Sequence, residues 1–579
     1  MNHSINKSKL RTFFSVLYLM SIVVLIIDYG YSLPLWLDYC FLGFYTLSLG
    51  VAVFFHALKL YKSEERHFRI DLLDGLSIAF IIICLYEQFI DDGTTFVVSD
   101  WMRWATILML IRGANLPKIN YKRSVLNPAR LFIISFVGLI GIGTFLLCLP
   151  NSTHGDISII DALFTATSAV CVTGLSVVDI GTYFTRFGQT IIMLLIQAGG
   201  LGILTFASYF SYFFKEGATY QNQIALSDIT NSQKISEVFT TLKRILVITF
   251  TVELIGAFLI FVNLSPKLIP QVGERIYFSV FHSISAFCNA GFSTLTNGLM
   301  AEGFVFNYRF QLTIITLFVF GGLGFPIVIN TLRYLKHLIK RYFLFFISGK
   351  DNYIPWILTL SSKINLITTA ILIVTGTGII YLKEYSHALA SHGGIGKFIT
   401  ALFTATTPRT AGFNTIDFND LQFSSIILII LLMWIGASPA STGGGIKTST
   451  FAIGTLNFLS LAKGKKKIEL FRREIADISV RRAFAVMSLS FIVIGTGVFL
   501  ISDFDNQLKL LDIAFECFSA YSTTGLSLGI TGLLSDSSKL VLVIMMFIGR
   551  VSMLTILIAL FRKSKNLTYR YPGDEILIN

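Results

Sequence analysis

Four short stretches of the sequence follow one pattern, in which a hydroxyl residue lies six positions before a glycine and an apolar residue follows that glycine. The stretches are Ser168–Leu175, Ser285–Phe292, Thr406–Phe413 and Ser519–Leu526. Such a stretch offers main-chain carbonyl oxygens, and oxygens that surround an alkali cation can replace its lost water. Glycine suits this backbone because, without a β-carbon, it allows unusual φ values and a close approach to a shared axis. The pattern therefore predicts the coordination of a dehydrated cation.

The predicted ligands are the three residues that end at each glycine. They are Val172, Thr173, Gly174, Asn289, Ala290, Gly291, Thr410, Ala411, Gly412, Thr523, Thr524 and Gly525. A single glycine in an apolar setting would often serve only to let two membrane helices pack closely. Four glycines at the same place in four similar segments favour the coordinating role.

A short apolar segment leads into each glycine. The four segments lie at about 159–171, 276–288, 397–407 and 510–521. Each is too short to cross a bilayer, which takes about 20 residues. We expect each to be a re-entrant half-helix whose partially negative C-terminus ends at mid-membrane, where it favours a cation.

The composition identifies the class of protein that holds these segments. Hydrophobic residues make up 54% of the 579 residues and charged residues 14%, about half the charged share of a soluble protein. This composition excludes a soluble enzyme, a disordered chain and a nucleic-acid partner, and it predicts a polytopic helical membrane protein. Much of the net charge of +13 lies in short loops, where Lys and Arg mark the cytoplasmic side. The six cysteines are scattered, so neither a disulfide framework nor a metal cluster is predicted.

Twelve apolar segments are predicted to cross the bilayer and to contact membrane lipid. They lie at about 12–30, 36–58, 70–90, 100–116, 131–150, 186–214, 241–263, 309–340, 359–382, 421–461, 480–502 and 538–562. The basic connections alternate so that both termini are expected in the cytoplasm. From residue 131 onward, the order span, half-helix, loop, span occurs four times.

The predicted fold is therefore an all-α integral membrane protein with four span–pore-helix–span repeats, preceded by about four extra transmembrane helices. The expected divisions are an N-terminal helical extension at 1–126 and pore repeats at 127–220, 221–350, 351–470 and 471–579.

Several stretches resemble the Trk, Ktr and plant HKT superfamily of K⁺ transporters, with the closest likeness to the Ktr-type membrane subunit. They are Ala162–Leu175, Gln197–Gly202, Thr407–Asn414 and Arg570–Pro572. The resemblance implies a pseudo-fourfold pore, a selectivity filter at the four glycine loops and K⁺ uptake across the plasma membrane. It also implies a homodimer with cytoplasmic nucleotide-binding subunits of the RCK type, and Na⁺ as a candidate activator. Family members with serine at the first filter position tend to admit Na⁺ alone, whereas this chain has Gly174 there.

The long segment at 421–461 is interrupted by Pro439 and by Gly443, Gly444 and Gly445, which cannot continue a helix. In the resembled family, the segment at this place is an intramembrane gate below the filter, and we include Lys447 in it. The alternative is a kink without a moving part.

Arg550 lies within the last span, where a charge needs a partner or a cavity. The resemblance places it beside the gate as an electrostatic barrier to cations; the alternative is that it only holds helices together. Ser552 and Met553 follow it where the family more often has Gly-Pro, which leaves the local helix geometry open.

The sequence also allows predictions for two further groups of charged residues. Arg409 lies close to the third filter loop, so we expect it to turn away and to pair with an acid such as Glu516. In the extension, Arg103 and Arg112 are too sparse for a typical voltage sensor, which favours a packing or assembly role.

Three classes of function follow from these observations. A K⁺-conducting uptake pore is the leading hypothesis, and a Na⁺- or H⁺-coupled K⁺ symporter or a Na⁺-permeable relative is the alternative. Paired broken helices of the kind common in symporters are not evident, since only the segment at 421–461 has a glycine break. An enzyme is not predicted, because no convergent catalytic constellation is visible in the spans.

Overall fold

The structure is a computed structural model that describes residues 2–32, 34–61, 68–90, 100–113, 128–202, 238–348, 358–465, 467–553 and 556–557. In this part of the chain the fold is helical except for one short antiparallel hairpin, β1 (Glu469–Leu470) and β2 (Arg473–Glu474). The all-α prediction is confirmed.

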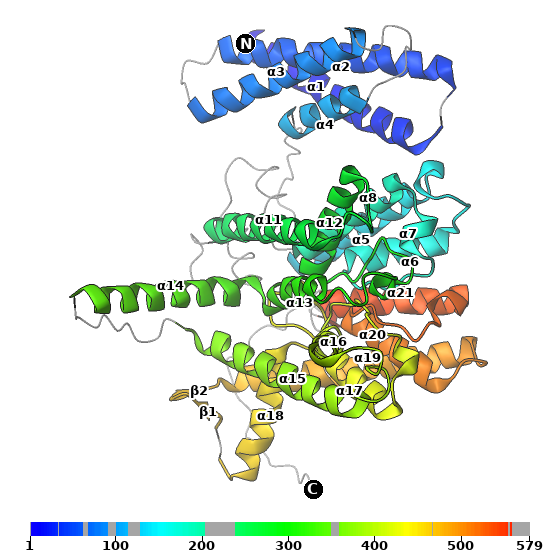
Figure 1. Cartoon of the computed structure of the whole chain (residues 1–579). Helices are drawn as coiled ribbons and strands as arrows, with labels where there is room; N and C mark the ends of the chain where they lie inside the picture. Colours follow the sequence, from blue (N-terminus) through cyan, green and yellow to red (C-terminus); the bar gives the residue numbers. More distant parts are fainter. Residues whose placement is uncertain are drawn as a thin grey trace, which may run out of the picture.

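The N-terminal extension consists of four helices, α1 (Asn2–Gly30), α2 (Leu35–Tyr61), α3 (Phe68–Ile90) and α4 (Asp100–Gly113). They lie together at one end of the molecule, drawn in blue in Figure 1. Their apolar side chains, among them Leu49, Ile81 and Met102, form a core of their own. The extension touches the first repeat where Asn151 donates a 3.1 Å hydrogen bond to the Tyr29 carbonyl and where Tyr29 stacks on Phe187.

The remaining helices follow the predicted order of four repeats. The longer helices are α5 (Pro128–Leu147), α8 (Arg186–Gly200), α11 (Val238–Asn263), α13 (Tyr308–Leu323), α14 (Phe325–Ser348), α15 (Leu360–Glu384), α17 (Phe423–Trp434), α18 (Thr448–Ala462), α19 (Asp477–Phe504) and α21 (Asp536–Val551). Short helical turns lie in the connections: α7 (Ile180–Tyr183), η1 (Pro150–Ser152), η3 (Gly298–Met300), η4 (Phe418–Asp420) and η5 (Thr531–Leu533).

The four short segments form the expected half-helices, α6 (Ile159–Val170), α12 (Val272–Phe287), α16 (Gly394–Thr406) and α20 (Leu510–Ser522). Most residues of their C-terminal halves are buried in the interior of the four repeats. The start of α6 follows from its capping residue, since Ser158 accepts a hydrogen bond from the Asp161 main-chain N–H. The half-helices are thus the elements that carry the glycine loops into the centre of the molecule.

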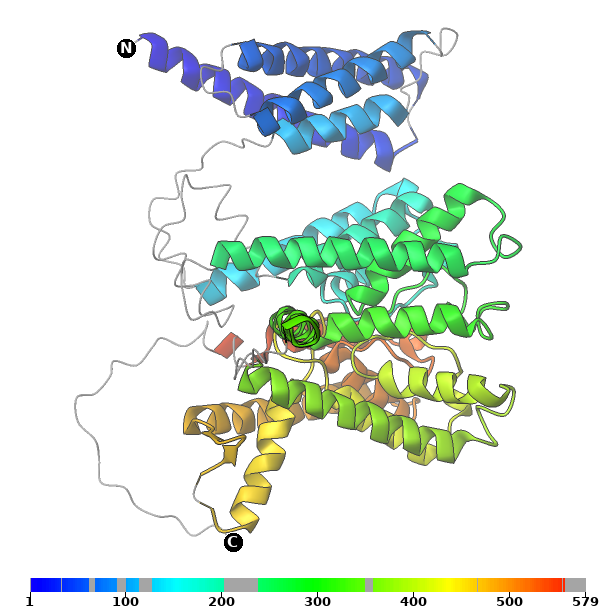
Figure 2. The ribbon, with the colours of Figure 1, turned by 60° about the vertical axis from the view of Figure 1, so that its left-hand side comes forward.

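Two predicted spans are not single straight helices. The segment at 309–340 breaks at Gly324, where φ is +84°, and α14 leaves α13 at a bend of 105°. Glycine tolerates this left-handed φ, whereas another residue would be strained. The segment at 421–461 is interrupted between α17 and α18, as its proline and glycines predict. In Figures 1 and 2, α18 runs across the direction that most other helices share.

Among the described residues, four helices are long and apolar enough to cross a bilayer by themselves, or five if the bent pair α13–α14 counts as one span. Shorter apolar helices, including α5, α6 and α17, lie beside them. The predicted total of twelve spans stays a prediction, because parts of the spans at 186–214 and 538–562 fall outside the described residues.

Candidate cation site

The backbone turns in the same way at the end of all four half-helices. The residue two positions before each glycine has a positive φ: 56° at Val172, 61° at Asn289, 70° at Thr410 and 50° at Thr523. The glycines themselves, Gly174, Gly291, Gly412 and Gly525, also have positive φ values, from 70° to 94°. Non-glycine residues rarely adopt this conformation. Its recurrence at four equivalent places shows that the four stretches are structural repeats.

A hydroxyl at the end of each half-helix fixes the loop that follows. Ser168 and Ser519 each accept a 3.1 Å hydrogen bond from the main-chain N–H of the glycine in their own repeat. Ser285 instead donates to the carbonyl of Phe292, at 2.7 Å. In the third repeat this role belongs to Thr407, which donates to Phe413 at 2.6 Å. Thr406, the hydroxyl residue six positions before Gly412, donates to a carbonyl of its own helix instead.

The four glycines form a closed ring. A β-carbon added to Gly174 would lie less than 3.0 Å from the carbonyl oxygen of Ala290, in the second repeat. A β-carbon added to each of the other three glycines would also lie less than 3.0 Å from a carbonyl oxygen in the next repeat. The pairs are Gly291 with Ala411, Gly412 with Thr524 and Gly525 with Thr173. Each repeat therefore abuts the next, and the fourth returns to the first. These contacts join eight of the twelve predicted ligand residues. The other four, Val172, Asn289, Thr410 and Thr523, directly precede them in the chain.

The ring is surrounded by the protein interior. Thr173, Ala290, Ala411 and Thr524 are all at most 1% exposed. Asn289 donates a 3.3 Å hydrogen bond to the Thr410 hydroxyl, which joins the second loop to the third. Backbone without helical hydrogen bonds at such depth is tolerated where it faces protein or a watery path. The geometry can therefore present carbonyl oxygens to a cation on the axis of the ring.

The segment between α17 and α18 lies directly against the ring. A β-carbon on Gly443 would collide with the Thr410 side chain, and one on Gly444 would collide with Thr523. The ends of the segment are held together by a parallel bridge between Ile435 and Ile446. The glycines are thus required here for close approach, not only for a bend.

Two cationic side chains hold this segment in place. The Lys447 ammonium donates to the carbonyl oxygens of Gly443, at 2.6 Å, and Gly444, at 3.3 Å. The Arg550 guanidinium donates to the carbonyl of Thr442 and, at 2.5 Å, to that of Gly199. In the described part of the chain, Arg550 therefore bridges the segment to α8 through carbonyl groups and not through a carboxylate.

Thr442 is a residue of this site that the sequence did not reveal. Its hydroxyl lies 3.3 Å from both the Phe287 carbonyl and the Asn289 side chain, and its own carbonyl accepts from Arg550. It thereby connects the glycine segment to the second half-helix. The only available signal was its position directly before the three glycines.

The expected pair between Arg409 and Glu516 is not formed. Arg409 donates to the Thr369 hydroxyl at 3.3 Å, while Glu516 accepts from Thr531. Arg409 does turn away from the ring, as expected, but toward α15 and not toward α20. The prediction was wrong because Arg409, in the loop after α16, and Glu516, on α20, face different neighbours.

In the extension, Arg103 is held by Asp28 through two hydrogen bonds, of 2.9 and 3.1 Å, and lies over the Tyr29 ring. Tyr45 donates a 3.0 Å bond to the same carboxylate. These contacts fit the packing role. The Arg112 side chain and Lys118 lie outside the described residues, as does the motif Arg570–Pro572.

Comparison with known proteins places the chain in a family. A family model described as TrkH, cation transport protein, matches residues 104–568. The chain is 37% identical to the Ktr system potassium uptake protein B of Bacillus subtilis over 78% of this chain and 96% of that protein. It is 34% identical to the potassium/sodium uptake protein NtpJ of Enterococcus hirae over 79% of this chain and 98% of that protein.

Among solved structures, the crystal structure of the potassium transporter TrkH from Vibrio parahaemolyticus matches with a TM-score of 0.60. The identity is 17%, and the match covers 95% of this chain and 98% of that chain. This likeness supports the fold. The family model and the Bacillus subtilis relative show that the chain belongs to the TrkH family of cation transport proteins.

Proposed function

We propose that this protein takes up K⁺ through a central pore whose selectivity filter is the ring of four glycine loops. The observation that carries the proposal is the closed circular order of Gly174, Gly291, Gly412 and Gly525. A ring of main-chain oxygens replaces the hydration shell of an alkali cation without adding a net charge that would trap it. The ligands are the carbonyl groups of the twelve residues that end at these glycines.

The names of the relatives support K⁺ as the transported ion. The Bacillus subtilis relative is a potassium uptake protein, and the Enterococcus hirae relative is a potassium/sodium uptake protein. We therefore propose K⁺ as the main substrate and Na⁺ as an activating or competing ion. A Na⁺- or H⁺-coupled symporter is the alternative within the same family.

The glycine segment that ends at Gly445 is proposed as the gate. Arg550 ties the segment to α8, and Lys447 donates to carbonyl groups of the segment itself. In this proposal their two positive charges lie on the ion path. A cation that passes the ring must therefore meet a barrier until the segment moves. Opening would release the carbonyls of Thr442, Gly443 and Gly444 from their tethers.

The proposed assembly is a homodimer in the plasma membrane with cytoplasmic nucleotide-binding subunits of the RCK type. Its support is the similarity to the Ktr system membrane proteins of Bacillus subtilis and Vibrio alginolyticus. Movement of the gate would then depend on these partners.

Ion flux in liposomes tests the function. Purified full-length protein, with and without a co-expressed regulatory partner, is reconstituted and K⁺ uptake is measured down a K⁺ gradient. The proposal expects saturable K⁺ flux that the partner increases and that persists when Na⁺ and the proton gradient are removed. Flux that requires Na⁺ or a proton gradient would favour the symporter, and an absence of K⁺ flux under every condition would refute the proposal.

A further inference from the structure

The Arg409 side chain is a buried charge without an acidic partner in the described part of the chain. It is 9% exposed, its Nη2 group donates to the Thr369 hydroxyl, and its Nε has no hydrogen-bond acceptor. A cation inside a membrane protein is costly unless an anion or a polar cavity balances it. One neutral hydroxyl does not balance the positive charge of a guanidinium group, so we expect Arg409 to have a further, anionic partner.

The immediate surroundings of Arg409 supply no such partner. A small cavity of about 10 Å³ lies against it, with room for about one water-sized group. Its other lining residues are Phe318, Val319, Gly322, Leu323, Thr369, Ile373, Thr406 and Ala437. None of them carries a negative charge.

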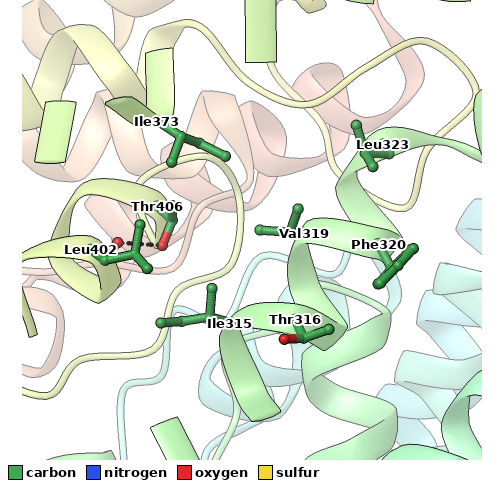
Figure 3. Close-up of a pocket in the computed structure, with 8 residues that line it drawn as sticks. All are labelled: Ile315, Thr316, Val319, Phe320, Leu323, Ile373, Leu402 and Thr406. Carbon is green, nitrogen blue, oxygen red and sulfur yellow. Dashed lines mark hydrogen bonds between the residues drawn. The ribbon is translucent and has the colours of Figure 1, made fainter. Parts of the chain in front are cut away.

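A larger apolar cavity of about 280 Å³ adjoins the small one and shares Val319, Leu323, Ile373 and Thr406 with it. It lies between α13, α15 and α16, so repeats two and three line it, and it is open on one side (Figure 3).

The polar groups in this larger cavity are already engaged. Its two hydroxyls belong to Thr316 and Thr406, and each donates to a carbonyl of its own helix, at 2.7 and 2.6 Å. Figure 3 shows the bond of Thr406 to Leu402. The wall is therefore suited to hydrocarbon and not to water.

An unbalanced cation beside an apolar pocket fits an occupant with an anionic end and one hydrocarbon chain. We propose that this site binds a long-chain fatty acid, with its carboxylate on Arg409 and its chain in the cavity between α13 and α15. A carboxylate matches the planar guanidinium in geometry as well as charge. One carboxylate oxygen is about the size of the group that the small cavity beside Arg409 admits, whereas a phosphodiester headgroup with two chains is larger.

The site lies directly behind the glycine ring. Arg409 precedes Thr410, whose side chain accepts from Asn289 and lies against Gly443 of the glycine segment. A bound fatty acid would stabilise the position of the third loop. Binding itself does not depend on the proposed transport function, and it is measured separately below.

The test uses full-length protein in lipid nanodiscs and a palmitic acid analogue that carries a photoreactive diazirine near the chain end. Crosslinked peptides are identified by mass spectrometry. The proposal expects labelling on α13 and α15. Labelling should fall at least tenfold in R409Q, which removes the charge, and in V319W, which fills the pocket but keeps Arg409. The control R309Q removes an exposed arginine on α13, one of the helices that line the pocket, and should leave labelling unchanged.

Three results would overturn the proposal. The first is equal labelling by the methyl ester of the probe, which would show that the charge is not recognised. The second is equal competition by phosphatidylglycerol and by unlabelled palmitate, which would assign the site to a phospholipid. The third is absence of labelling in dimeric protein at any probe concentration, which would show that a second copy covers the cavity. If R409Q does not fold, the variants R409K and V319W test the proposal in its place. R409K should retain part of the labelling, and V319W should lose it.

Discussion

At the residue scale, four glycines occupy positions where no side chain fits. Gly174, Gly291, Gly412 and Gly525 each combine a positive φ with a neighbouring carbonyl less than 3.0 Å from any added β-carbon. Either property alone would penalise substitution, and both act here at once. A substitution in the ring should therefore change ion discrimination before it changes the overall fold.

Replacement of Gly174 by serine is expected to lower the preference for K⁺ over Na⁺ at least tenfold, which corresponds to about 1.4 kcal/mol. The serine side chain must displace the Ala290 carbonyl and so distorts one quarter of the ring. The measurement is Na⁺ and K⁺ flux in liposomes. G141S is the matched control, because Gly141 has open space around it on α5 in the same repeat. Equal selectivity of G174S and wild type would remove Gly174 from the filter.

Replacement of Lys447 by methionine is expected to increase basal K⁺ flux several-fold without the regulatory partner. The change removes two charge-assisted hydrogen bonds that hold the Gly443 and Gly444 carbonyls, each worth about 1.5–3 kcal/mol. K463M, at the exposed end of α18, is the control. Unchanged or lower flux in well-folded K447M would mean that the lysine does not restrain the gate.

At the scale of elements, the sequence predicted the half-helices closely. Their bounds agree within a few residues because short apolar segments between longer ones have few alternatives. The bend of 105° between α13 and α14 was not predicted, since Gly324 is one of several glycines in an apolar run. The partner of Arg409 was also missed, because side-chain pairing between distant helices leaves no pattern in one sequence.

In the N-terminal extension, too, the sequence predicted the helices but not the side-chain contacts between them. The sequence predicted its four helices, but not that Asp28 would hold Arg103 and Tyr45. The Ktr relative of Bacillus subtilis is covered almost completely by 78% of this chain, which fits an added N-terminal part. The match to TrkH covers 95% of this chain and therefore includes most of the extension.

Replacement of Asp28 by asparagine is expected to destabilise the extension by about 3 kcal/mol, because it leaves Arg103 without its buried partner. Hydrogen exchange of α1 and α4 would measure the loss, and K⁺ flux should change little. D100N is the control, since the Asp100 side chain is 77% exposed and its ion pair should contribute less than about 1 kcal/mol. A voltage-dependent change of flux in D28N would instead support a sensing role.

At the scale of the whole molecule, the four sequence repeats form one ring because their glycine loops meet. Composition and periodicity predicted the membrane class and the repeats, and the circular contacts of the glycines were visible only in the structure. The order in which each loop abuts the next could not be read from the sequence, since it depends on how repeats far apart in the chain pack. In the proposed function, this order lets the carbonyl groups of the four loops surround one cation.

The most direct test of the central claim is anomalous diffraction from crystals of the full-length protein grown with Rb⁺ or Tl⁺ in place of K⁺. The account predicts anomalous density on the axis that Gly174, Gly291, Gly412 and Gly525 surround, and its loss when Na⁺ or Li⁺ replaces the heavy ion. Ordered ions elsewhere in the protein, together with an empty ring, would contradict it.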